Sequence, residues 1–203
     1  MVKKIVFLIF TILIFSNCED IRQEFNWADL KINDATVEDI TRKFPDVEAI
    51  NLNNTRITNR SLFYIGTRSK ELTELYVNHN KITDGAFSYL INLKKLTKLS
   101  LAETPITDVG LSYILKITSL KELNLNETAI TDNGMKSIEK LSKLEKLKLL
   151  KVKISDKSIK HLKTLKFLEF IDLTDTNITD KGVAELQKAL PECKIKKLEA
   201  IKY

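Results

Sequence analysis

The chain has 203 residues, of which 33 are basic and 27 are acidic, and its formal net charge is +6. Five glycines and three prolines are too few for a low-complexity linker. A single elongated domain with a continuous hydrophobic core is therefore expected.

Residues 1–17 have the features of an export signal. Lys3 and Lys4 precede an unbroken apolar run over residues 5–15, which matches the charged and hydrophobic regions of such signals. As a helix this run would be about 17 Å long, well short of the roughly 30 Å hydrocarbon core of a bilayer. It is therefore predicted to direct export and not to span the membrane.

The signal ends in Phe15, Ser16, Asn17 and Cys18. This sequence resembles a bacterial lipobox, whose cysteine receives a diacylglyceryl group and becomes the new N-terminus. Phe15 stands where leucine is usual and Asn17 where glycine or alanine is usual, as in the relaxed lipoboxes of spirochaetal lipoproteins. The resemblance implies a lipoprotein anchored through Cys18 to a bacterial membrane, at the outer membrane or cell surface. Without lipidation of Cys18, the same signal predicts a secreted protein.

The segment after Cys18 is predicted to lead into a capped repeat array. Residues 18–25 are expected to form a tether and residues 26–46 an N-terminal cap. Within the cap, Asp29–Ile32 fits a strand. A helix is expected to begin at Thr36, where Thr36 and Asp39 approximate a capping box.

Residues 47–191 contain one pattern six times. Strand-type hexamers begin 24 residues apart, at Leu72, Leu96, Leu120, Leu144 and Leu168, and an earlier copy begins at Val47. An Ile-Thr-Asp or Ile-Ser-Asp triplet follows most hexamers, and apolar residues then recur at every third position. One unit buries about eight apolar side chains, too few to offset the entropy of ordering it. The units must share one core, which residues 192–203 are predicted to cap at its C-terminal end.

The pattern LxxLxLxxTxITDxGLxxLxxLxxL resembles that of the leucine-rich repeat family, in particular bacterial members with TxITDxGL. The resemblance implies an α/β fold, a right-handed solenoid or horseshoe with a parallel β-sheet on its concave side and helices on its convex side. It also implies a role in interaction and not an enzymatic activity. No catalytic motif accompanies the repeats, whose only histidines are His79 and His161.

Two polar positions of the repeat are predicted to be structural. The aspartate of the triplet is expected to stabilise the start of the convex helix by accepting backbone N–H bonds. A second position is expected to satisfy backbone groups inside the turn: Thr55, Asn80, Thr104, Thr128 and Thr176. Val152 interrupts this series, so its repeat is expected to be less regular.

The outward side chains of the concave strands form the predicted binding face. Glu74, Lys98, Glu122 and Lys146 alternate in charge at the third hexamer position, which predicts a cross-strand ladder. Aromatic residues on such a polar face are typical binding anchors. The residues predicted to contact a partner, most simply a protein, are Tyr76, Lys98, Glu122, Asn124, Lys146, Lys148, Phe170 and Asp172.

Two alternatives concern other ligands. His79, Glu103 and Glu127 occupy equivalent places in successive repeats, and zinc accepts imidazole and carboxylate ligands, so they form either a metal site or solvated loop residues. Eight lysines over residues 146–166 form a basic belt, which is either a solubilising surface or a site for an anionic glycan or lipid headgroup. They are Lys146, Lys148, Lys151, Lys153, Lys157, Lys160, Lys163 and Lys166. A structural envelope lipoprotein without a soluble ligand is a further alternative, and nucleic acid is not expected as a partner of an exported chain.

Overall fold

The computed structural model describes residues 32–198. The predicted signal, the lipidation site at Cys18, the tether and most of the predicted strand at Asp29–Ile32 lie outside the described residues. Within residues 32–198, no helix is both long and apolar enough to cross a membrane.

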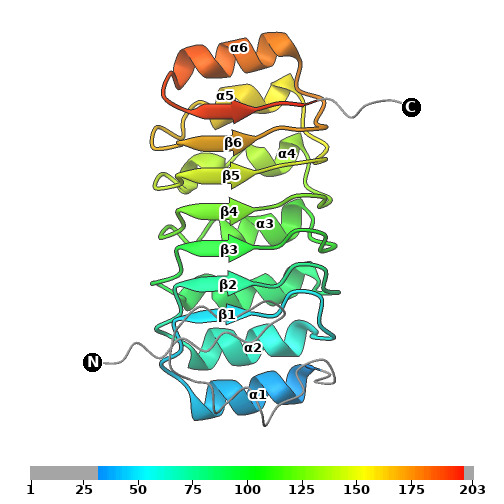
Figure 1. Cartoon of the computed structure of the whole chain (residues 1–203), viewed down its shortest axis with the longest axis vertical. Coiled ribbons are helices and arrows are strands. Elements are labelled where there is room, and N and C mark those ends of the chain that lie inside the picture. The colour runs from blue at the N-terminus through cyan, green and yellow to red at the C-terminus, as the bar shows by residue number, and fades with distance from the viewer. Residues whose placement is uncertain (1–31, 199–203) are drawn as a thin grey trace, which may run out of the picture.

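The described part of the chain contains seven short parallel strands, which lie side by side in chain order as one open sheet (Figure 1). Each strand covers the third to fifth positions of its hexamer, and each pairs with the next without a shift in register, so that Glu74 faces Lys98 and Lys98 faces Glu122. The predicted rows of equivalent side chains are thereby confirmed. The strands are β1 (Ala49–Asn51), β2 (Glu74–Tyr76), β3 (Lys98–Ser100), β4 (Glu122–Asn124), β5 (Lys146–Lys148), β6 (Phe170–Asp172) and β7 (Lys194–Lys196).

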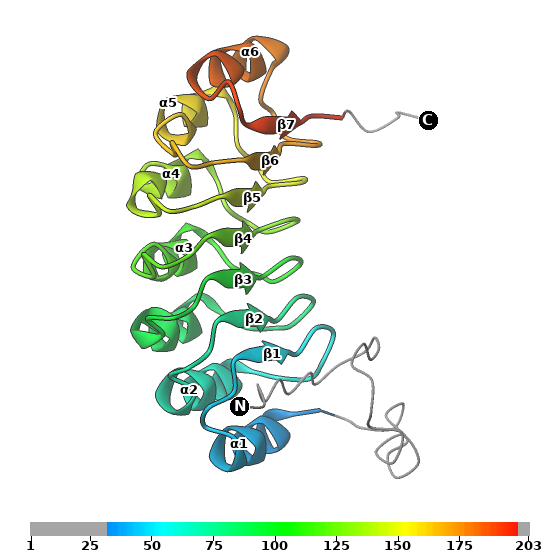
Figure 2. The same cartoon turned by 60° about the vertical axis from the view of Figure 1, so that its left-hand side comes forward.

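Helical segments are stacked on the opposite side of the core (Figure 2). Several are wholly or partly 3₁₀ helix, because apolar residues at every third position suit three residues per turn. The segments are α1 (Asp34–Lys43), α2 (Asn59–Arg68), the 3₁₀ helix η3 (Asp84–Asn92), α3 (Asp108–Ile114), α4 (Asp132–Met135) with the 3₁₀ helix η4 (Ile138–Lys140), the 3₁₀ helix η5 (Asp156–Ser158) with α5 (Ile159–Leu162), and α6 (Asp180–Ala189).

One hydrophobic core runs through all the units, from Val37 to Cys193. In the hexamer of β3, Leu96, Leu99 and Leu101 are at most 2% exposed. Since each unit packs its leucines against those of the units on either side, no unit has a core of its own. The prediction of a shared interior is confirmed.

The threonines predicted to lie inside the turns do satisfy backbone groups there. Thr104 Oγ1 donates to the Leu101 carbonyl oxygen at 2.6 Å, and Thr128 Oγ1 donates to that of Leu125 at 2.6 Å. The repeat with Val152 nevertheless keeps the same turn. Its Lys151 has a φ of 56°, the same value as Glu103 at the equivalent position of an earlier repeat. The loss of regularity predicted for this repeat is not observed at its turn.

The triplet aspartate binds the neighbouring repeat. The residue that caps α3 is Thr107, whose hydroxyl accepts from the Val109 amide. Asp108 is the first residue of the helix, and its carboxylate accepts the amide of Thr131 at 2.8 Å and the hydroxyl of Thr131 at 2.6 Å. The prediction that the aspartate caps its own helix is therefore wrong, because Thr107 caps α3 and the N–H that Asp108 accepts belongs to the next unit. This contact is called the Asp–Thr bridge below.

The Asp–Thr bridge recurs along the array with conservative variations. Asp84, Asp132 and Asp156 bind the next Thr or Ser in the same way, and Asn59 takes the place of the aspartate toward Thr83. Gly134 leaves room for this contact, since a Cβ there would lie 3.1 Å from Cγ of Asp108. The repeated glycine of the motif is therefore explained by the bridge of the preceding unit.

Both ends of the repeat array extend into the predicted caps. Helix α1 begins at Asp34 with Asn33 as its N-cap, and not at Thr36. Asp34 forms a bridge to Thr58, so Ile32-Asn33-Asp34 is a degenerate copy of the triplet. At the other end β7 pairs with β6 inside the segment predicted as the C-terminal cap. The array is therefore longer than residues 47–191.

The bridges predict an acid-sensitive stability. Burial raises the pKa of Asp132, but hydrogen bonds from the Ser155 amide, the Ser158 hydroxyl and the Ser155 hydroxyl outweigh it, so the pKa lies below its ordinary value of 3.8. A carboxyl with a lowered folded-state pKa stabilises the protein above its unfolded-state pKa, and this stabilisation is lost as the pH falls through the folded-state value. We expect the free energy of unfolding to be level above about pH 5 and to fall below about pH 4. Urea denaturation across this range should show a smaller acid loss for Asp132→Asn, and an unchanged acid loss would contradict the assignment.

Candidate functional site

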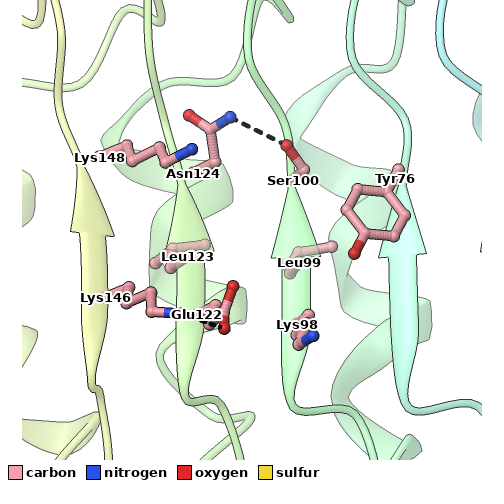
Figure 3. A pocket seen from close by; sticks show the side chains of 9 residues that line it. All are labelled: Tyr76, Lys98, Leu99, Ser100, Glu122, Leu123, Asn124, Lys146 and Lys148. Atoms are coloured by element: carbon pink, nitrogen blue, oxygen red, sulfur yellow. Dashed lines mark hydrogen bonds and ion pairs between the residues drawn. The ribbon is translucent and has the colours of Figure 1, made fainter. Parts of the chain in front are cut away.

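Two rows of side chains project from the concave face of the sheet. The first row holds the third hexamer position and the second row holds the fifth, and both continue onto β7. Between β2 and β5 they surround a hollow of about 80 Å³ (Figure 3), lined by Tyr76, Lys98, Leu99, Ser100, Glu122, Leu123, Asn124, Lys146 and Lys148. Sites for small ligands are usually about 300–1,000 Å³. The hollow is therefore smaller than the usual range for such sites.

The charges of the first row form two separate pairs. Lys98 Nζ lies 3.0 Å from Glu74 Oε1, and Lys146 Nζ lies 3.0 Å from Glu122 Oε1. The hydrogen bond with Glu74 is the main cause of the raised pKa of Lys98. The predicted alternation is confirmed, and the four residues largely neutralise each other.

Tyr76 is less available than predicted. Its ring is half-buried, and its hydroxyl donates to Glu74 Oε2 at 2.9 Å. Burial, followed by this hydrogen bond, raises the pKa of the phenol. Phe170, the other predicted anchor, is also half-buried but has no polar group to satisfy. Both residues therefore lie on the outward rows, as predicted, and their role as binding anchors stays a prediction.

Two other predicted contact residues have side chains that are hydrogen-bonded within the fold. Asn124 accepts the amide of Asn126 at 3.1 Å and donates to Ser100 Oγ at 3.0 Å. Asp172 is only 6% exposed, and its carboxylate accepts the Thr174 amide at 3.0 Å and Lys196 Nζ at 2.9 Å. Although burial acts to raise the pKa of Asp172, these bonds hold it below its ordinary value. The carboxylate of Asp172 is thus buried and occupied within the fold, and its contact with a partner stays a prediction.

Sequence reasoning missed the lysines of β7. Lys194 lies next to Phe170 in the first row, and Lys196 lies next to Asp172 in the second row. Ile195 follows Ile171 by the repeat length, with a lysine on each side. That spacing could have identified β7, but no leucine begins its hexamer.

The three predicted zinc ligands are not brought together. His79 Nδ1 lies 3.0 Å from Glu103 Oε2, whereas Glu127 Oε2 pairs with Lys151 Nζ at 3.1 Å. In the part of the chain that the structure describes, no three His, Cys, Asp or Glu side chains are grouped so that they could hold a metal ion.

The lysines of the predicted basic belt are distributed over one repeat as predicted, from the sheet and its turn to the helices of the convex side. Lys146, Lys151 and Lys163 are paired with Glu122, Glu127 and Glu185. The remaining lysines are divided among the sheet, the turns and the helices of the convex side: Lys148, Lys153, Lys157, Lys160 and Lys166.

Comparison with known proteins agrees with this architecture. The family model described as Leucine Rich repeat matches residues 69–88, 92–115, 116–138 and 160–186. Among solved structures, an internalin from Listeria monocytogenes is similar with a TM-score of 0.63 and 23% sequence identity, over 85% of this chain and 52% of the internalin chain. The chain thus spans about half the length of that protein, and at this identity the likeness shows the fold alone. The search of curated proteins gave no match. The matched segments are similar to leucine-rich repeats, and the fold is the solenoid of parallel strands that the sequence predicts.

Proposed function

We propose that this leucine-rich repeat protein is an exported, lipid-anchored binding module that docks a protein partner on its concave sheet. Leucine-rich repeat proteins typically mediate protein interactions, and solenoids use extended concave surfaces for this purpose. The observation that carries the proposal is the pair of in-register rows on the concave face, whose hollow between β2 and β5 has a volume of only about 80 Å³.

Export and anchoring are supported by the N-terminal sequence. Lys3 and Lys4, the apolar run over residues 5–15, and Cys18 have the order of a lipoprotein signal. Two or more acyl chains on Cys18 hold a protein stably on a membrane. Mass spectrometry of the mature N-terminal peptide tests this proposal, and an unmodified Cys18 would make the protein a secreted one.

The docking proposal predicts that Phe170→Ala weakens partner capture. We expect at least about a tenfold loss of partner affinity, since a central aromatic anchor contributes roughly 2 kcal/mol or more to an interface. The full-length protein and the variant are immobilised, and proteins captured from cell-surface extracts are compared by quantitative mass spectrometry.

Phe63→Ala is the matched control. Phe63 is an aromatic residue of α2 on the convex side and is 42% exposed. Proteins retained by this variant and lost with Phe170→Ala are concave-face partners. Equal capture by all three proteins would contradict docking on the sheet. Recovery of membrane components only would favour a structural envelope lipoprotein.

A further inference from the structure

We infer that the partner presents an acidic segment with an apolar side chain, and that this segment is received over β5 to β7. The inference rests on the proposed function and specifies the chemistry of its partner. The inference is based on those side chains of the concave face that form no hydrogen bond or ion pair within the described part of the fold.

The strands β2 to β4 offer few free polar groups. Glu74 is held by Lys98 and by the Tyr76 hydroxyl, and Glu122 is held by Lys146. A partner charge placed here would compete with an existing pair, so its net gain is small. This part of the face contributes shape more than charge recognition.

The second half of the face presents two lysines without acidic partners. Lys148 pairs in the sheet with Asn124 on one side and with Asp172 on the other, whose carboxylate is bound by Lys196. Figure 3 shows the Lys148 side chain reaching across toward Asn124 at the rim of the hollow. Lys194 pairs with Phe170, which carries no charge. Both lysines are exposed, and within residues 32–198 neither makes an ion pair, so a carboxylate is their natural complement.

Phe170 adds an apolar component between these charges. It lies in the first row between Lys146 and Lys194, with neighbouring strands about 4.8 Å away on either side. Glu122 of the neighbouring strand β4 pairs with Lys146. Lys121 pairs with Glu145, which lies outside the two rows. Other acidic residues outside the two rows are Glu169, Asp175 and Glu192. The two rows over β5 to β7 therefore contain four lysines, one buried aspartate and one aromatic ring. A segment with an apolar residue flanked by Asp or Glu is complementary to this arrangement.

Two fluorescent peptide pools of equal length and apolar content provide the test, one rich in Asp and Glu and the other rich in Lys and Arg. We expect the full-length protein to bind the acidic pool in anisotropy titrations. The affinity should fall when the salt concentration rises from about 0.1 M to about 1 M, because the Debye length shortens from roughly 10 Å to 3 Å. Lys148→Glu combined with Lys194→Glu should weaken binding of the acidic pool at least about tenfold and favour the basic pool.

The matched control combines Lys157→Glu with Lys160→Glu, the same charge change on exposed lysines of the convex side. This control should bind the acidic pool as the wild type does. If both pools bind equally and both depend on Phe170, the inference is overturned while docking on the concave face stands. If neither pool binds, the inference is overturned and the capture experiment still decides the proposed function. Lysine-dependent binding of a sulfated polysaccharide or of phosphatidylserine vesicles, with no binding of acidic peptides, would also overturn it.

Discussion

Replacing Gly66 with alanine should lower the free energy of unfolding by about 3 kcal/mol, the upper part of the range for forcing a methyl group into a packed site. Gly66 is buried in α2, where the backbone of η3 passes directly over it. A Cβ at this position would lie 2.7 Å from the carbonyl carbon of Tyr89 and closer still to its oxygen. Because the obstacle is main chain, it cannot move away by changing a rotamer, and η3 as a whole would have to shift. Urea denaturation monitored by circular dichroism measures the effect.

Gly85→Ala is the control for the Gly66 substitution. Gly85 lies in η3 and is exposed, and a Cβ there meets no atom within 4 Å. Its φ is not positive, so alanine fits the backbone and should stabilise the protein by up to about 1 kcal/mol. Equal loss of stability in the two variants would show that helix propensity, and not the close approach of Tyr89, determines the need for glycine.

Asp108→Ala should destabilise the protein by about 2 to 3 kcal/mol, whereas Asp108→Asn should cost less than about 1 kcal/mol. Alanine leaves both the amide and the hydroxyl of Thr131 without the carboxylate that they bind. Asparagine can replace both bonds, as Asn59 does toward Thr83, where the side-chain oxygen accepts the amide at 2.9 Å and Nδ2 donates to the hydroxyl at 2.7 Å. Thermal and urea unfolding of the two variants check the difference.

The Asp108 result also distinguishes a bridge from a helix cap. If the aspartate stabilised only the positive end of its own helix, asparagine would lose the charge effect and fall closer to alanine. Asp180, the last copy of the aspartate, has no following triplet within the described residues. Asp180→Ala should therefore cost much less than Asp108→Ala, and an equal cost would rule out the bridge as the source of stability.

The architecture could be predicted from the sequence because one period determined it. Leucines recurring every 24 residues specify both the inward face of each strand and the pairing of each strand with the next. A single register then follows for the whole sheet, and Glu74 opposite Lys98 is one example. The ends were harder to predict, because Ile32-Asn33-Asp34 and the hexamer of β7 depart from the consensus that identifies the inner repeats.

The sequence predicted which side chains lie on the concave face, but not which of them remain free to contact a partner. Sequence position places Asn124 and Asp172 on the outward row, which is correct. Whether such a side chain remains free depends on a neighbour 24 residues away, such as Lys196 for Asp172. It depends also on local bonds within the turn, such as that from the Asn126 amide to Asn124. Periodicity does not contain this information. The side-chain bonds seen in the structure leave only Lys148 and Phe170, of the eight predicted contact residues, without a side-chain hydrogen bond or ion pair in the described part of the fold.

Because the strands lie in chain order, each later strand is farther from the N-terminal end of the sheet. Since β1 to β7 follow one another without exchange, and adjacent strands are about 4.8 Å apart, Phe170 lies about 24 Å farther along the sheet than Ala49. For a chain held to a bilayer through Cys18, the lysine-rich strands would stand out from the headgroups. Inserting or deleting a complete unit between β2 and β5 would alter that reach in steps of about 4.8 Å, with the contact residues themselves unchanged.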